Sequence, residues 1–141
     1  MNTYNFRNLF SLVCILSLCL LSFSCGDDDT PADESTNDDL NGVWIATSYQ
    51  QVGIELIPSS VTSLELTFTK SDAVSGSFSA VTTTASGNPS TAAASYSVVD
   101  DGNRIKIGTD TLDLTSSSSN LTLDGNILFS VGETSISATK Q

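Results

Sequence analysis

Strict alternation of apolar and polar side chains is the feature that most constrains the fold of this chain. In Leu64-Glu65-Leu66-Thr67-Phe68-Thr69, every apolar side chain falls on one face of an extended strand and every polar one on the other. Shorter runs at residues 96–98, 105–107, 112–114 and 121–123 repeat this pattern. Val, Ile, Thr, Tyr and Phe dominate the runs, as strands prefer. The sequence therefore predicts an all-β fold built from half-buried strands.

We expect eight or nine strands, some of the predicted ranges merging into one. The ranges are 42–51, 53–57, 62–69, 74–81, 94–99, 104–108, 111–114, 120–124, 127–131 and 134–139. The run 127–131 is continuously apolar and fits a strand that is covered on both faces. Short strands joined by hairpins favour a small antiparallel up-and-down barrel, because closure removes exposed edges. A β-sandwich has the same alternation and is the alternative fold.

Turn residues separate most of these ranges. Asp101-Gly102-Asn103 and Asp124-Gly125-Asn126 predict tight hairpin turns, because Asp-Gly tolerates positive φ. Gly108-Thr109-Asp110 predicts a third turn. Residues 115–119 and 82–94 read as loops, the second around Ser86-Gly87-Asn88-Pro89-Ser90. No helix is expected beyond a single turn near Pro58.

The first 24 residues form a predicted signal peptide. One charged side chain, Arg7, precedes an apolar run at 9–21, which is shorter than the roughly 20 residues needed to span a bilayer. The stretch Leu21-Ser22-Phe23-Ser24-Cys25 resembles the looser lipoboxes of Bacteroidetes-type lipoproteins, with small Ser24 before the cysteine. The resemblance implies cleavage before Cys25 and its acylation with palmitate-type chains, which would tether the protein to the outer membrane. A free thiol or an interchain disulfide at Cys25 is the alternative.

Residues 25–39 form a predicted disordered tether. Residues 26–39 carry seven acids, no base and no hydrophobe larger than alanine, so this stretch cannot bury apolar surface on its own. Its start, Asp27-Asp28-Asp29, resembles the signal that exports some Bacteroidetes lipoproteins to the outer face of the outer membrane. A solvated spacer is the simpler interpretation. The aspartates lack the spaced ligands of a calcium loop, so no metal is predicted there.

Composition excludes several function classes for residues 40–141. The whole chain has a net charge of −11, which disfavours nucleic acid as a partner. It contains no histidine, and no cysteine follows Cys25. This removes Ser-His-Asp and Cys-His catalysis and zinc sites built on these residues. A carboxylate pair or a Ser/Lys dyad remains for catalysis, and no pattern marks either. We predict no enzyme, catalytic residue or cofactor.

The start of the domain carries a second resemblance. Leu40-Asn41-Gly42-Val43-Trp44 resembles the Leu-x-Gly-x-Trp opening of lipocalins and of small lipocalin-like domains in Bacteroidetes lipoproteins. The resemblance implies that Trp44 packs in the barrel base. The chain departs from the family in its short length, in the lack of a C-terminal helix, and in offering no later basic residue that can be placed against Trp44.

These features lead to two functional hypotheses. The first is a lipid-anchored, non-catalytic binding domain that holds a small apolar ligand. The second is a structural or interaction lipoprotein with a filled barrel that contacts envelope proteins or glycans. The sequence assigns no ligand-binding residue. The aromatic side chains that could line a cavity, or simply form the core, are Tyr49, Phe68, Phe78, Tyr96 and Phe129. Because about 100 residues make a narrow barrel, we expect a filled or very small interior.

Overall fold

The computed structural model describes residues 32–126 and 132–141. These residues form one helix and nine strands. The elements are α2 (Ala32–Leu40), β1 (Gly42–Gln51), β2 (Ile54–Glu55), β3 (Val61–Lys70), β4 (Ser75–Thr84), β5 (Pro89–Val99), β6 (Arg104–Ile107), β7 (Asp110–Ser116), β8 (Asn120–Asn126) and β9 (Glu133–Lys140).

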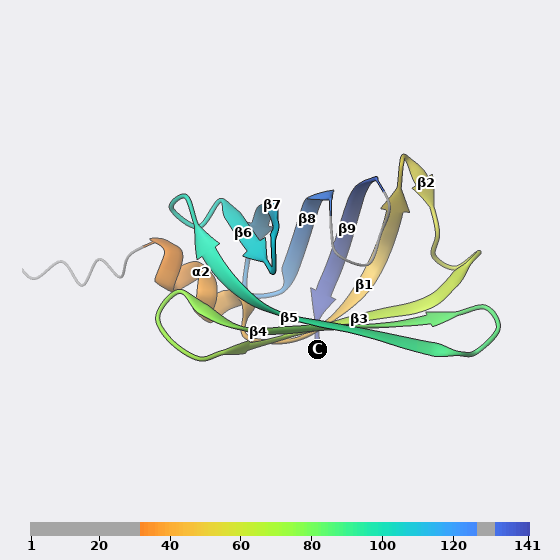
Figure 1. Cartoon of the computed structure of the whole chain (residues 1–141), viewed down its shortest axis with the longest axis horizontal. Helices are drawn as coiled ribbons and strands as arrows, with labels where there is room; N and C mark the ends of the chain where they lie inside the picture. The colour runs from red at the N-terminus through yellow and green to blue at the C-terminus, as the bar shows by residue number, and fades with distance from the viewer. Residues whose placement is uncertain (1–31, 127–131) are drawn as a thin grey trace, which may run out of the picture.

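The strands close into an antiparallel up-and-down barrel (Figure 1). β3 to β9 pair in chain order, and β1 pairs with both β3 and β9, so eight strands complete the ring. The short strand β2 pairs only with the end of β1. This confirms the predicted all-β barrel and makes the sandwich alternative wrong. It is the strand arrangement of the lipocalins.

Strand β1 pairs with two neighbours and carries a β-bulge on its β9 side. Residues 42–45 of β1 pair with β3, whereas its later part follows β9, and the register shifts between Ala46 and Ser48. Bulges bend a strand and increase its twist. Beyond Ile45, β1 continues beside β9 and no longer pairs with β3.

The alternating runs place their apolar side chains inside the barrel, as predicted. Leu64, Leu66 and Phe68 are buried, whereas Glu65 between them is partly exposed. The same holds for the other predicted runs, whose members join one continuous core. The period of two therefore correctly assigned the inner face of these strands.

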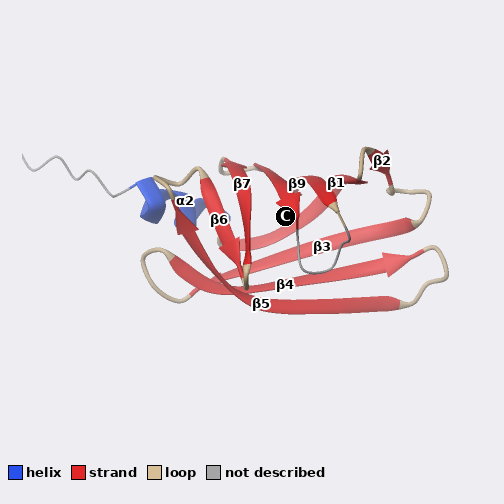
Figure 2. Cartoon of the chain, turned by 45° about the horizontal axis from the view of Figure 1, so that its top comes forward, coloured by secondary structure: helices blue, strands red, loops and turns tan. Residues whose placement is uncertain are grey.

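The hairpin of β4 and β5 is longer than expected. β3, β4 and β5 lie together as a lower layer and continue beyond the shorter strands at the end opposite α2 (Figures 1 and 2). The predicted loop at 82–94 is wrong, because β4 runs to Thr84, β5 begins at Pro89, and only residues 85–88 connect them. Backbone hydrogen bonds pair this segment although its side chains are too small to form a core.

One predicted turn is also wrong. Asp124-Gly125-Asn126 lies within β8, where Asn126 pairs with Glu133 of β9. The connection between these strands therefore comes later, and the predicted strand 127–131 lies outside the described residues. The turns at 101–103 and 108–110 are confirmed in position, because they separate β5 from β6 and β6 from β7.

Part of the predicted disordered tether is a helix. α2 spans residues 32–40 and packs against β5, β3 and β7. Asn37 and Leu40 are fully buried in this contact. The acidic composition gave no sign of this, because the stability comes from contacts with residues far along the chain rather than from the segment itself.

Candidate functional site

Helix α2 closes one end of the barrel through a buried asparagine. The Asn37 side-chain amide donates to the carbonyl oxygens of Asp72 and Ala73 at 3.0 and 3.2 Å. Its Oδ1 accepts a 2.6 Å hydrogen bond from the Tyr96 hydroxyl. Both ends of the Asn37 amide are therefore used, which offsets the cost of burying a polar side chain. These bonds lock α2 to the β3–β4 connection and to β5.

Trp44 forms the base of the closed end, as the resemblance implied. Its ring is fully buried, and Nε1 donates to the Leu40 carbonyl oxygen at 2.7 Å. Lys140 Nζ lies 5.3 Å from the ring centroid and donates to the Asp39 carbonyl oxygen at 2.8 Å. A basic residue does pack against the tryptophan, so the expected departure from the family is wrong. The residue was missed because Lys140 is the penultimate residue of the chain, far from Trp44 in sequence.

Aromatic rings fill the barrel next to α2. The Phe68 ring centroid is 5.1 Å from that of Phe78 and 5.3 Å from that of Tyr96, in tilted and edge-on geometry. Gly76 makes room for this packing, because a Cβ there would lie 2.2 Å from the Thr69 carbonyl oxygen and 2.7 Å from the Tyr96 ring. At this end, the predicted cavity-lining aromatics are core residues. Phe129 lies outside the described residues.

On β4 and β5, the inward side chains become smaller toward the other end. On β4, Phe78 is followed on the same face by Ala80 and Thr82, and on β5 the run from Tyr96 back to Ala94 and Ala92 does the same. Pairing places Ala94 opposite Phe78 and Ala92 opposite Ala80. The inner surface of β4 and β5 thus carries large side chains near α2 and small ones toward residues 85–88. We call this end of the barrel the mouth.

Tyr49 places a hydroxyl group on the inner wall of the mouth half. The residue is 5% exposed and belongs to the core. Its hydroxyl makes no hydrogen bond within the described part of the chain. Burial raises the pKa of Tyr49, which keeps the hydroxyl protonated and able to donate.

Glu55 organises the rim beside Tyr49. Its carboxylate accepts hydrogen bonds from the Ser48 hydroxyl at 2.6 Å and from the Tyr49 and Ile57 backbone amides at 2.9 and 3.2 Å. The Ser48 bond, followed by the Tyr49 amide, lowers the pKa of Glu55. Glu55 therefore stays ionised and holds the β2 segment against β1.

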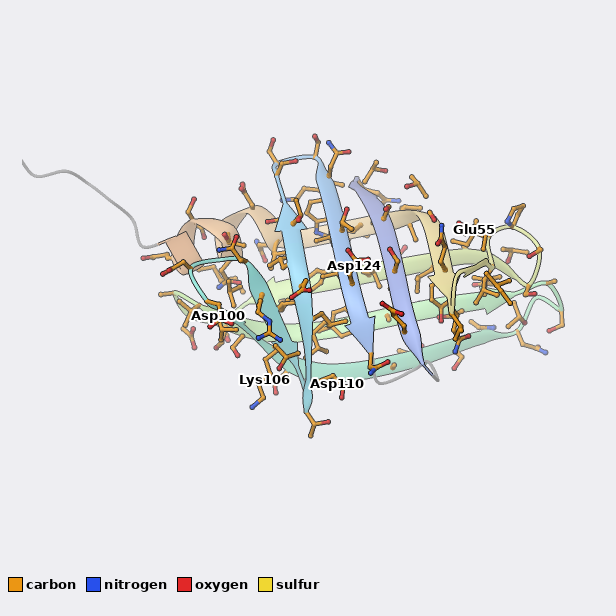
Figure 3. The ribbon with its side chains drawn as sticks, turned by 90° about the horizontal axis from the view of Figure 1, so that it is seen from above. Glu55, Asp100, Lys106, Asp110 and Asp124 are labelled. Carbon is orange, nitrogen blue, oxygen red and sulfur yellow. The ribbon has the colours of Figure 1, made fainter. Side chains whose placement is uncertain are left out.

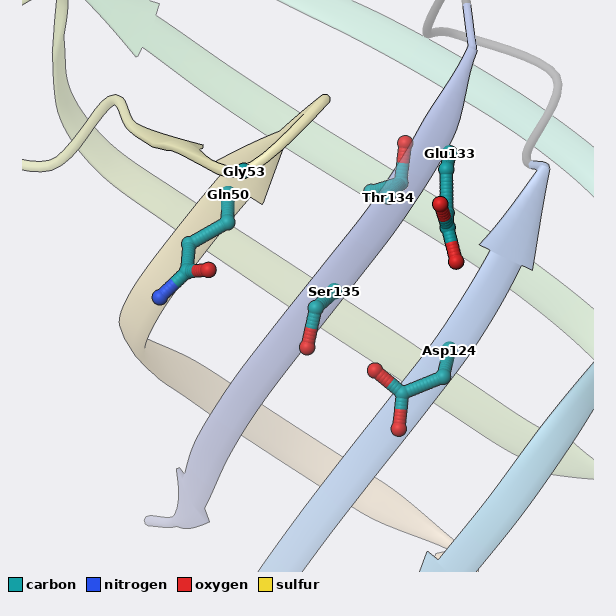
Figure 4. Close-up of a pocket in the computed structure, with 6 residues that line it drawn as sticks. All are labelled: Gln50, Gly53, Asp124, Glu133, Thr134 and Ser135. Atoms are coloured by element: carbon teal, nitrogen blue, oxygen red, sulfur yellow. The ribbon is translucent and has the colours of Figure 1, made fainter.

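A polar groove of about 260 Å³ lies near the ends of β1 and β9, beside β8 (Figure 4). Gln50 and Asp124 flank Ser135 in register, with Glu133 at the start of β9. Asp124 and Glu133 are two carboxylates in one groove, the arrangement that could support glycosidase chemistry. Both are exposed, whereas a catalytic acid needs an apolar pocket to stay protonated. The groove therefore lacks the environment for acid catalysis.

A second groove of about 290 Å³ lies on the outside of β4, β5 and β6. Its lining consists of Ser75, Ser95, Tyr96, Ser97, Lys106 and Gly108. Ser97 pairs with Ser75 on one side and with Lys106 on the other, so two serines and the lysine lie side by side on three neighbouring strands. Figure 3 shows Lys106 and Asp110 at one margin of the barrel, far from Glu55.

The sequence-predicted site residues Cys25, Asp27, Asp28 and Asp29 all lie outside the described residues, so acylation and export stay predictions. Within residues 32–126 and 132–141, no helix has the length and apolar character to cross a membrane. The same residues hold no group of three or more His, Cys, Asp or Glu side chains arranged for a metal ion.

The fold is that of a small closed eight-stranded β-barrel protein. A redesigned β-barrel is similar, with a TM-score of 0.55 and 13% identity over 75% of this chain and 94% of that chain. Two further solved structures match with a TM-score of 0.46. Japanin from Rhipicephalus appendiculatus bound to cholesterol is 11% identical, covering 72% of this chain and 76% of its own. Lobster apocrustacyanin A1 is 15% identical, covering 82% and 69%. No protein-family model and no curated protein matches the sequence.

Sequence reasoning missed Asn37 and did not separate Tyr49 from the other aromatics. Asn37 lies in an acidic segment with no apolar periodicity, and no local pattern identifies it. Tyr49 follows a bulge, so counting in twos from Trp44 places it on the wrong face. Only the register of β1 against β9 shows that it points inward.

Proposed function

We propose that the protein is a lipid-anchored, non-catalytic binding domain whose mouth half takes a small apolar ligand bearing one polar group. The Tyr49 hydroxyl carries this proposal, because it lies on a largely apolar inner wall and makes no hydrogen bond within the described part of the chain. Binding sites of this kind combine apolar walls with a few placed polar groups. Such a ligand would lie beside the small inward side chains of β4 and β5, which are Ala80, Ala92 and Ala94.

The anchor in this proposal is Cys25, with Asp27-Asp28-Asp29 as the export signal to the outer face of the outer membrane. Only six residues, 26–31, separate Cys25 from α2, and even fully extended they span about 20 Å. The closed end would therefore face the membrane and the mouth would face away from it. This orientation leaves the mouth accessible to ligands outside the membrane.

Native mass spectrometry of the protein purified from its own host tests the proposal first. An added mass that is lost on denaturation would identify the natural ligand. The apolar fluorophore N-phenyl-1-naphthylamine then tests the mouth directly. We expect its fluorescence to rise with saturation at one molecule per barrel.

Three variants locate this binding. Ala94→Trp fills the space beside β5 and should weaken fluorophore binding at least tenfold, whereas Ala93→Trp, whose side chain points outward on the same strand, should not. Tyr49→Phe should weaken natural-ligand binding about fivefold through loss of one hydrogen bond. Equal binding by the Ala94→Trp and Ala93→Trp proteins would exclude the mouth as the site.

A further inference from the structure

Strand β5 is paired on both sides along only part of its length. β4 covers residues 89–97 of β5, whereas β6 pairs only with residues 96–99. Gly108 adds one more hydrogen bond, to the Ser95 carbonyl oxygen at 2.9 Å. Beyond that point, residues 89–94 have no strand beside them on this side among the described residues.

The backbone groups of this edge point outward. The Ser95 carbonyl faces β6, and the Val98 amide donates to the Val74 carbonyl oxygen at 2.8 Å on the opposite side. Because backbone direction alternates along a strand, the amides and carbonyls of Thr91 and Ala93 face away from β4. No hydrogen bond to these groups forms within the described part of the chain. Figure 2 shows β5 as the outermost strand of the lower layer.

The edge has little protection against pairing. Residues 90–95 are Ser, Thr, Ala, Ala, Ala and Ser, which are small and uncharged. Exposed edges are usually blunted by lysine, proline, bulges or a covering segment. Here only Pro89, at the far end, serves this role. The edge is thus suited to accept another strand.

The groove that contains Lys106 lies where this edge ends. Its other lining residues include Ser95, Ser97 and Gly108, the residues that mark the transition from free edge to paired strand. Lys70 pairs with Asp38, and Arg104 lies 3.4 Å from both Asp100 and Asp113. Lys106 makes no ion pair with any described carboxylate, so it is a cation available to a ligand.

We propose that the free edge of β5 binds the C-terminal tail of a partner protein as an added β-strand, with the tail's terminal carboxylate held by Lys106. Backbone hydrogen bonds to Thr91 and Ala93 would supply affinity, as in other cases of strand addition. The ammonium lies at the Ser95 end of the edge, so the tail runs parallel to β5. The chain's net charge of −11 disfavours acidic tails and favours neutral or basic ones.

Two libraries of random heptapeptides test this proposal with the whole protein in detergent. One library carries free C-terminal carboxylates and the other carries C-terminal amides. We expect enrichment from the carboxylate library only. Selected peptides should shift the backbone amide signals of Thr91, Ala93, Lys106 and Gly108 in an ¹⁵N-labelled sample.

Substitutions test the contributions of the β5 edge and of Lys106 to peptide binding separately. Ala93→Pro removes an outward amide without touching the β4 ladder, so the barrel should keep its stability and lose the peptide at least tenfold. Ala93→Thr keeps the amide and should bind normally. Lys106→Gln should reduce the preference for carboxylate over amide to about one, and Lys106→Arg should preserve it.

Either of two results would overturn the proposal. One is equal recovery of peptides by the wild type and the folded Ala93→Pro protein. The other is a selected peptide that binds Lys106→Gln with an unchanged carboxylate preference. Neither result depends on a ligand in the mouth, because Thr91 and Ala93 lie on the edge and fluorophore binding can be measured in the same variants.

Discussion

Tyr96 contacts both helix α2 and the core at the closed end, and its own ionisation affects the stability there. Its ring packs edge-on against Phe68, and its hydroxyl donates to Asn37. Burial, followed by the negative charge of Asp72, raises the pKa of Tyr96 to about 12. Asp72 itself has a lowered pKa, mainly because the Ser75 hydroxyl donates to it. The stability of the closed end therefore depends on whether the Tyr96 hydroxyl is protonated at alkaline pH.

Tyr96→Phe should destabilise the protein by about 1 to 3 kcal/mol at neutral pH, because Asn37 Oδ1 loses its buried donor. In the unfolded chain Tyr96 loses its proton near pH 10, before the folded state does, so wild-type stability falls as pH rises from 10 to about 12. The loss is on the order of 2 kcal/mol. Urea unfolding at pH 8, 10 and 11.5 checks this. The gap between wild type and Tyr96→Phe should narrow with pH, and a constant gap would contradict the assignment.

At the scale of elements, α2 is a helix that its own sequence does not stabilise. Nine residues are too few for a stable isolated helix, and its last turn carries Asp38 and Asp39 but no base. The barrel supplies the missing positive charges, because Lys70 pairs with Asp38 and Lys140 caps the Asp39 carbonyl. The helix and the barrel end therefore form one unit.

Asn37→Ala should release α2 while leaving the strands intact. The variant loses hydrogen bonds to Asp72, Ala73 and Tyr96, at about 1 kcal/mol each. Hydrogen exchange read by mass spectrometry should show faster exchange in residues 34–40 and unchanged protection in β8 and β9. Ser35→Ala, on the exposed side of the helix, is the matched control. Equal protection of α2 in both variants would show that Asn37 does not hold the helix.

At the scale of the whole molecule, the two ends of the barrel differ. One end is closed by α2, Trp44 and Lys140. At the other end, β4 and β5 carry small inward side chains, and residues 89–94 of β5 have only β4 as a neighbour among the described strands. In the proposed anchored form, the closed end would face the membrane, so the mouth and the edge would both face outward. The lipid anchor would then lie at one end of the barrel and the proposed binding surfaces at the other.

Cys25→Ser should move the protein from the membrane fraction to the soluble fraction of its host, because acyl chains supply the proposed anchor. Cys19→Ser, within the leader, should leave the distribution unchanged. Metabolic labelling with an alkyne palmitate, followed by fractionation, gives both readouts. Membrane retention of unlabelled Cys25→Ser protein would rule out the lipid anchor.

The sequence by itself determined the all-β class and the inner faces of the alternating strand segments. The alternation at 64–69 predicted the burial of Leu64, Leu66 and Phe68. This is a local property, because a period of two decides which side chains share a face wherever the strand lies. The packing of Trp44 in the base was implied by the Leu-x-Gly-x-Trp resemblance.

Only the tertiary structure decided how the ends are built. The Asn37–Tyr96 bond joins residues 59 apart, and Lys140 reaches Asp39 across 101 residues. The inward turn of Tyr49 depends on a bulge, and the free edge of β5 depends on how early β6 ends. Such features follow from register and closure, which a local pattern does not encode, because each contact is set by where two distant segments meet.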